Sequence, residues 1–123
     1  MEPLTPVVLI VEDELLLRMD LAEMIEEAGF GVVQAANADE AIVILRMRSD
    51  VRVVFTDIQM PGSMDGLNLA RFVRDRWPPI KIVATSGRVT VGDGDLPDGG
   101  VFLPKPYRSA QVVATLRALT TPP

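Results

Sequence analysis

Five short apolar segments rich in β-branched residues recur along the chain and determine its predicted architecture. The first reads VVLIV and has no polar position, which is typical of a strand buried on both faces of a parallel sheet. Each segment is short enough to be a single strand. We predict strands at Val7–Val11, Gly31–Ala35, Val51–Thr56, Ile80–Thr85 and Val101–Leu103.

Four other stretches show the apolar spacing of amphipathic helices. The first places its apolar residues on one stripe and stops at Gly29, and the second begins at Asn37, which with Glu40 forms a capping-box-like start. The stripe of the first helix contains Leu17, Leu21, Met24, Ile25 and Ala28. The predicted helices are Glu14–Ala28, the stretch from Asn37 to about residue 48, Leu67–Trp77 and Ser109–Leu119.

Strands that alternate with helices at short spacing predict a doubly wound α/β domain with a parallel sheet. We expect residues 1–123 to form this single domain, with no linker and no output domain. One connection departs from the pattern, because the segment GRVTVGDGDLPDGG is rich in glycine and aspartate, so its helix is expected to be short or missing. Its aspartates do not have the spacing of a calcium loop.

Composition excludes several kinds of chemistry. The chain has neither cysteine nor histidine, so disulfides, thiol nucleophiles, Ser-His triads and histidine-ligated metals are excluded. A net charge of -5 argues against a direct nucleic-acid partner. No 18-residue apolar stretch or signal peptide is visible, so we expect a cytoplasmic protein that does not insert into a membrane.

Polar residues gather where the predicted strands end. Functional residues of open parallel sheets lie beyond the carboxyl ends of the strands, and clustered carboxylates there favour a hard cation such as Mg²⁺. Taken singly, each residue has a simpler interpretation: Asp13 could cap the next helix, Ser86 could cap another, and Lys105 could be a solvated charge. The strand-end residues are Glu12, Asp13, Asp57, Thr85, Ser86 and Lys105.

Four separated motifs occur in order at these strand ends: VEDE, FTDIQMPGSMDGLNL, VATSG and FLPKPY. Together they resemble the receiver domain of bacterial two-component response regulators over essentially the whole chain. The resemblance implies a flavodoxin-like five-stranded sheet of order 2-1-3-4-5. It also implies a phosphoacceptor aspartate that a histidine kinase or histidine phosphotransfer protein phosphorylates, switching a surface that binds a downstream protein.

The motif positions imply a role for each site residue. Asp57 would be the phosphoacceptor, and Glu12 and Asp13 would bind Mg²⁺ together with Asp57 and the backbone carbonyl of Gln59. Lys105 would contact the phosphoryl group and form a cis bond to the following proline.

The resemblance also implies a switch. Ser86 would be the switch hydroxyl, with Thr85 the less favoured alternative, and Phe102 the switch aromatic. By the same analogy Leu15, Arg18 and Asp20 are candidates for kinase contact. They can equally be ordinary solvent-facing residues.

This sequence departs from the family pattern in two places. PGSMDG is one residue longer than the commonest turn, and the glycine-rich segment replaces most of a helix, which leads us to expect that residues 88–100 are mobile and order on phosphorylation or partner binding. Gln59 and Arg88 occupy positions that tune phosphoryl lifetime in the family.

Other functions stay open beside a stand-alone receiver. The chain could be the receiver of a hybrid histidine kinase, and homodimer formation is left open. A Mg²⁺-dependent hydrolase with Asp57 as nucleophile is disfavoured, because Gln59 stands where such enzymes carry a second acid. A degenerate, non-phosphorylated binding domain is disfavoured because every expected site residue type is present. We expect a phosphoacceptor rather than an enzyme.

Overall fold

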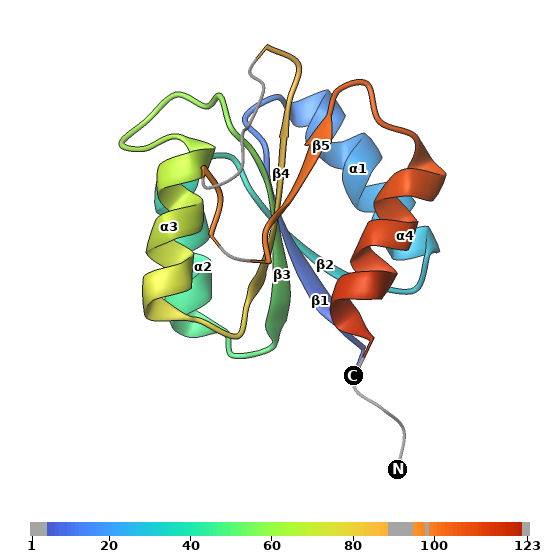
Figure 1. The fold of residues 1–123 in the computed structure, drawn as a ribbon, viewed down its shortest axis with the longest axis horizontal. Helices are drawn as coiled ribbons and strands as arrows, with labels where there is room; N and C mark the ends of the chain where they lie inside the picture. Colours follow the sequence, from blue (N-terminus) through green and yellow to red (C-terminus); the bar gives the residue numbers. More distant parts are fainter. Residues whose placement is uncertain (1–4, 89–94, 98, 122–123) are drawn as a thin grey trace.

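The computed structural model, which describes residues 5–88, 95–97 and 99–121, has a central parallel sheet between two pairs of helices (Figure 1). The spatial order of the strands is β2-β1-β3-β4-β5, which confirms the predicted flavodoxin-like, doubly wound class. The strands are β1 (Val7–Val11), β2 (Gly31–Ala35), β3 (Val51–Asp57), β4 (Lys81–Ser86) and β5 (Val101–Pro104). The helices are α1 (Leu15–Glu27), α2 (Ala38–Met47), α3 (Gly66–Arg76) and α4 (Ser109–Thr120).

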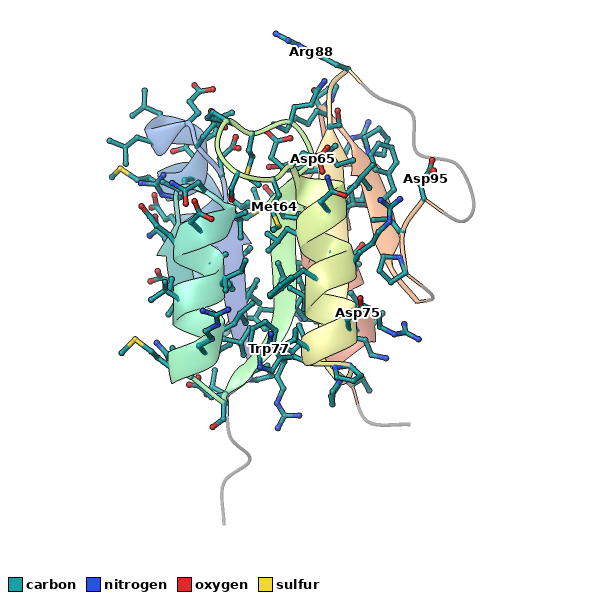
Figure 2. All side chains as sticks on the ribbon, turned by 90° about the vertical axis from the view of Figure 1, so that its left-hand side faces the viewer. Met64, Asp65, Asp75, Trp77, Arg88 and Asp95 are labelled. Carbon is teal, nitrogen blue, oxygen red and sulfur yellow. The ribbon has the colours of Figure 1, made fainter. Side chains whose placement is uncertain are left out.

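The central strand β1 explains why its sequence has no polar position. Val7, Leu9 and Val11 pack into the core beneath α2 and α3, whereas Val8 and Ile10 pack into the core beneath α1 and α4. Because side chains alternate between the faces of a strand, a strand covered on both faces must be apolar throughout. Figure 2 shows α2 and α3 side by side on one face, with Asp65 near one end of α3 and Trp77 near the other.

Local signals fix the helix ends. Gly29 has a φ of 99°, the left-handed conformation that ends α1, and its N–H donates to Glu26 O at 2.9 Å. The Asn37 side chain accepts a hydrogen bond from Glu40 N at 2.9 Å, which confirms the predicted start of α2. Asp65 caps α3 in the same way, by accepting from Asn68 N.

The apolar stripe of α1 is only partly buried. Leu21 and Ile25 lie in the core as predicted, but Leu17 is 41% exposed. Leu17 lies on the first turns of the helix, beside the connection between β5 and α4, where it lines a groove instead of the core. Among the described residues, no helix combines the length and the apolar character that a membrane span needs.

The connection between β4 and β5 differs from the other connections in that its described residues form no helix, as the sequence predicts. Leu96 packs against the core under α2 and α3, and Arg71 of α3 donates from Nη2 to Asp95 O at 3.2 Å. The predicted mobility of residues 88–100 concerns a segment of which residues 89–94 and 98 lie outside the described part of the chain.

Candidate functional site

Strand ends bring three carboxylates together at one edge of the sheet. Oxygen atoms of Glu12, Asp13 and Asp57 all lie within 4.8 Å of one another. Glu12 directly follows β1 and Asp57 is the last residue of β3, which pairs with β1 in parallel. Glu12 is 6% exposed and Asp57 is 9% exposed, whereas Asp13 is exposed. The predicted cluster of strand-end acids is therefore present.

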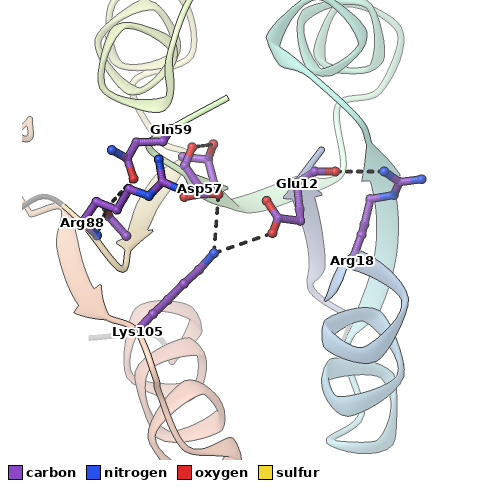
Figure 3. Close-up of polar contacts among 8 residues, drawn as sticks. Glu12, Arg18, Asp57, Gln59, Arg88 and Lys105 are labelled. Carbon is purple, nitrogen blue, oxygen red and sulfur yellow. Dashed lines mark hydrogen bonds and ion pairs between the residues drawn. The ribbon is translucent and has the colours of Figure 1, made fainter. Parts of the chain in front are cut away.

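Lys105, which follows β5, supplies a positive charge to the cluster. Its Nζ lies 3.4 Å from Asp57 Oδ2 and 3.6 Å from Glu12 Oε1 (Figure 3). The peptide bond from Lys105 to Pro106 is cis, as predicted. The ammonium group therefore bridges two buried carboxylates rather than lying free in solvent.

Burial and charge perturb one member of the cluster strongly. Burial of the Glu12 carboxyl and the neighbouring charge of Asp57 raise the pKa of Glu12 from 4.5 to about 7, although Lys105 acts in the opposite direction. Three acids beside one lysine leave the site with excess negative charge. A divalent cation would relieve this repulsion.

The donor set fits a hard divalent cation. Glu12 Oε2 is buried with no hydrogen-bond partner within the described chain, and Glu12 is a member of the carboxylate cluster. Carboxylate oxygens are the ligands that Mg²⁺ prefers, and a buried carboxylate oxygen without a protein partner is suited to bind an ion or a water molecule. Asp13 is available for this role because Glu14, not Asp13, occupies the N-cap position of α1, where no side-chain cap forms.

Ser86 and Thr85, the two hydroxyls at the end of β4, have different surroundings. Ser86 is 2% exposed; its Oγ donates to Gln59 Oε1 at 3.2 Å and accepts from Arg88 N at 3.1 Å. Thr85 Oγ1 is buried without a partner in the described chain and lines a small cavity of about 10 Å³ beside Asp57. Thr85 thus lies at the cavity beside the acids, whereas the Ser86 hydroxyl contacts the loop that follows Asp57.

The predicted switch aromatic, Phe102, is half-buried in β5 and pairs in register with Ala84 of β4. A second aromatic that sequence reasoning missed lies closer to the acids. The Tyr107 ring meets Phe55 edge-on, with centroids 5.9 Å apart and an interplanar angle of 76°, and Tyr107 lines the small cavity with Glu12 and Asp57. The sequence signal that could have placed Tyr107 near the acids is its position two residues after Lys105, at the end of the FLPKPY motif.

Arg18 has a structural role that the sequence did not reveal. Its Nη1 donates to Glu12 O at 2.8 Å (Figure 3). Its Nε donates to Gln34 Oε1 of β2 at 3.2 Å. The guanidinium therefore ties α1 to the backbone of a site acid and to the neighbouring strand. Leu15 and Asp20, the other candidates for kinase contact, are exposed.

Gly66 permits a close backbone approach at the end of β3. A Cβ atom at this position would lie 2.2 Å from Asp57 O and 2.7 Å from Ile58 Cα, and Gly66 N donates to Ile58 O at 2.8 Å. We expect Gly66→Ala to lower the free energy of unfolding by about 2–3 kcal/mol, because the backbone around Asp57 must shift. Urea titration measures this loss.

Gly87→Ala provides the matched control for Gly66→Ala. A Cβ at Gly87 would meet Lys105 Cβ at 3.6 Å, an ordinary contact, so its effect should stay within about 0.5 kcal/mol. A Gly66→Ala protein as stable as the Gly87→Ala protein would contradict the prediction.

The raised pKa of Glu12 predicts a pH-dependent stability in metal-free protein. Between pH 4.5 and 7 the folded state binds a proton at Glu12 that the unfolded state has lost, so the free energy of unfolding falls as pH rises through this window and levels off above it. A shift of this size corresponds to a fall of about 3 kcal/mol attributable to Glu12. Urea unfolding in EDTA measures it, and Glu12→Gln should remove it. Equal slopes for both proteins would refute the prediction.

Comparisons with known proteins agree with this arrangement. The family described as the response regulator receiver domain matches residues 8–117. The sensor kinase CckA of Brucella abortus (strain 2308) is 34% identical over 91% of this chain, which spans 12% of that kinase. An NtrX-like response regulator of Rickettsia bellii (strain RML369-C) is 32% identical over 89% of this chain, which spans 24% of that protein.

Solved structures show the same fold. The crystal structure of a response regulator receiver protein from Sinorhizobium medicae WSM419 is 30% identical, with a TM-score of 0.84 over 94% of each chain. The family match covers nearly all of the sheet and its helices, including every acid of the cluster and Lys105. The chain belongs to the response regulator receiver domain family of two-component signalling.

Proposed function

We propose that this chain accepts a phosphoryl group on Asp57 from a histidine kinase or a histidine phosphotransfer protein. The observation that carries the proposal is the position of the Asp57 carboxylate, at the carboxyl edge of the sheet beside two other acids and 3.4 Å from Lys105 Nζ. A carboxylate nucleophile next to a fixed cation is suited to phosphoryl transfer. The chain itself would act as a phosphoacceptor whose state other proteins read, rather than as a conventional enzyme.

The transfer follows from these residue types. An oxygen of the Asp57 carboxylate attacks phosphorus, the bond from phosphorus to the donor's nitrogen or oxygen breaks, and the donor leaves with that electron pair. The product is an acyl phosphate on Asp57. The Lys105 ammonium lies where it can offset negative charge on the transferring oxygens.

The groups that would hold a Mg²⁺ ion are the side chains of Glu12, Asp13 and Asp57 and the backbone carbonyl of Gln59. When bound, the ion supplies positive charge at the oxygens of the transferring group. The cluster of three carboxylates and the orphaned Glu12 Oε2 support this assignment.

A phosphorylated Asp57 would offer new acceptor oxygens to its neighbours. We propose that Ser86 and Lys105 donate to these oxygens, that the loop after β4 moves inward, and that Phe102 turns into the space vacated. The half-buried position of Phe102, on the strand next to Ser86, supports this role. Phosphorylation would in this way change a surface that a downstream protein reads.

The first turns of α1 are the proposed contact surface for the phosphoryl donor. Leu15, Leu16 and Met19 are 55%, 69% and 52% exposed, an unusual concentration of apolar surface. A groove of about 410 Å³ runs along another face of the same helix, lined by Leu17, Met24 and Tyr107 among others. The groove reaches Lys105, so a partner seated there would approach Asp57.

A second candidate function is that of the receiver within a hybrid histidine kinase. The 34% identity to a sensor kinase supports it, because this chain spans only 12% of that protein. A hydrolase with Asp57 as nucleophile fits less well, since Gln59 cannot exchange protons as a general acid or base.

Intact-mass analysis tests the proposal. After incubation with acetyl phosphate and Mg²⁺ the chain should gain the mass of one phosphoryl group, and the gain should vanish when EDTA replaces Mg²⁺. Reduction with borohydride followed by peptide mapping should locate the group on Asp57. A folded chain that gains no mass from acetyl phosphate, phosphoramidate or a phosphorylated histidine donor would overturn the proposal.

A further inference from the structure

The hydroxyl of Ser86 is engaged by a side chain other than the proposed phosphoacceptor. Its Oγ donates to Gln59 Oε1 at 3.2 Å and accepts from Arg88 N at 3.1 Å (Figure 3). A serine hydroxyl carries a single hydrogen, so it has one donor to give. While that hydrogen points to Gln59, it is not available to another acceptor.

We propose that Gln59 is a latch that holds Ser86 in the unphosphorylated arrangement by competing with the phosphoryl group for this hydrogen. The inference rests on the proposed function, because it assumes that Ser86 donates to a phosphoryl oxygen on Asp57. Gln59 acts through Ser86 and is a positioning residue. Breaking its hydrogen bond is then part of the cost of switching.

The location of both residues supports a latch of this kind. Ser86 is 2% exposed and belongs to β4, whose backbone is fixed on one side by β3 and on the other by Lys105 N, which donates to Ser86 O at 3.0 Å. Gln59 is exposed and lies on the loop after β3, two residues beyond Asp57. Ser86 is thus fixed in place, and the exposed Gln59 side chain is the partner that can move away and break the hydrogen bond.

The Ser86 hydroxyl also connects the loop after β3, which carries Gln59, to Arg88 after β4. The same Oγ accepts a hydrogen bond from Arg88 N, so a change in the position of the Ser86 hydroxyl also changes the hydrogen bonding of the Arg88 amide. Breaking the bond from Ser86 to Gln59 would therefore alter the environment of the Arg88 amide even without a phosphoryl group. This effect can be measured without any metal or phosphoryl donor.

The test compares the wild-type chain with Gln59→Met, which removes the side-chain acceptor but keeps the backbone carbonyl and the length of the side chain. The probe is beryllofluoride with Mg²⁺, a mimic of the phosphoryl group, titrated by calorimetry. Without the competing bond, Gln59→Met should bind the probe about three- to tenfold more tightly. Gln111→Met, an exposed glutamine of α4, is the matched control and should bind as the wild type does.

A double-mutant cycle separates a latch from a general effect at the site. In the Ser86→Ala background, which has no hydroxyl to release, Gln59→Met should leave the probe affinity unchanged. Unchanged or weaker binding by Gln59→Met alone, or a gain that persists with Ser86→Ala, would overturn the inference.

A metal-free measurement distinguishes failure of the latch from failure of the proposed function. In ¹H–¹⁵N correlation NMR spectra recorded without ligand, Gln59→Met should shift the Arg88 amide resonance and speed the hydrogen exchange of that amide. Gln111→Met should change neither. If the wild type does not bind the probe, the proposed function fails. If it binds the probe while the Arg88 amide and the affinity are both unaffected by Gln59→Met, only the latch fails.

Discussion

Asparagine in place of Asp57 is expected to give a folded chain that gains no phosphoryl mass from any donor. The substitution keeps the size of a side chain that is 9% exposed, so the packing around it survives, but an amide is not a nucleophile toward phosphorus. Mg²⁺ affinity should fall as well, because one of the three clustered carboxylates is lost. Intact-mass analysis and calorimetric titration of Mg²⁺ measure the two effects.

Asp75→Asn is the matched control for this substitution. Asp75 is an exposed residue near the end of α3, on the side of the molecule shown in Figure 2, and its loss should change neither phosphorylation nor Mg²⁺ affinity. Phosphoryl gain by folded Asp57→Asn protein, mapped to another residue, would show that the acceptor had been assigned wrongly.

Methionine in place of Lys105 is expected to slow phosphorylation by about 10²- to 10³-fold at equal donor and Mg²⁺ concentrations. Methionine keeps most of the length of the side chain but removes the ammonium group that lies 3.4 Å from Asp57 Oδ2 and 3.6 Å from Glu12 Oε1. Charge developing on the transferring group then loses a preorganised partner. The initial rate of mass gain measures the effect.

The chain contains a second lysine that serves as a control. Lys81 is exposed at the start of β4, the opposite end of that strand from Ser86, so Lys81→Met should phosphorylate at the wild-type rate. Equal rates for Lys105→Met and Lys81→Met would refute the proposed role of Lys105.

Most of the fold follows from the sequence because burial on two faces leaves a distinctive pattern. The all-apolar run of β1 and the caps at Gly29 and Asn37 each reflect a local physical requirement that one segment reveals. The edge at which Glu12 and Asp57 meet also follows, since strand ends of a parallel sheet share one edge.

Contacts between distant side chains could not be read in the same way. Three such contacts depend on the rotamer that each side chain adopts: the hydrogen bond from Arg18 to Glu12 O, the bond from Ser86 to Gln59 and the edge-on contact of Tyr107 with Phe55. The exposure of Leu17 had a similar cause. Helical periodicity shows which residues share a face, but not how far the neighbouring elements cover that face.

The chain's only tryptophan and only tyrosine lie in different optical environments. Trp77 caps the far end of α3 and packs near Phe72, whereas Tyr107 lines the cavity beside Glu12 and Asp57. Burial and these two carboxylates raise the pKa of Tyr107, so its phenol stays protonated at neutral pH. Tryptophan emission therefore reports the integrity of the α2 and α3 side, and tyrosine difference absorption reports what happens at the acids. A single unlabelled sample therefore carries one chromophore for the α2 and α3 side and another for the acidic site.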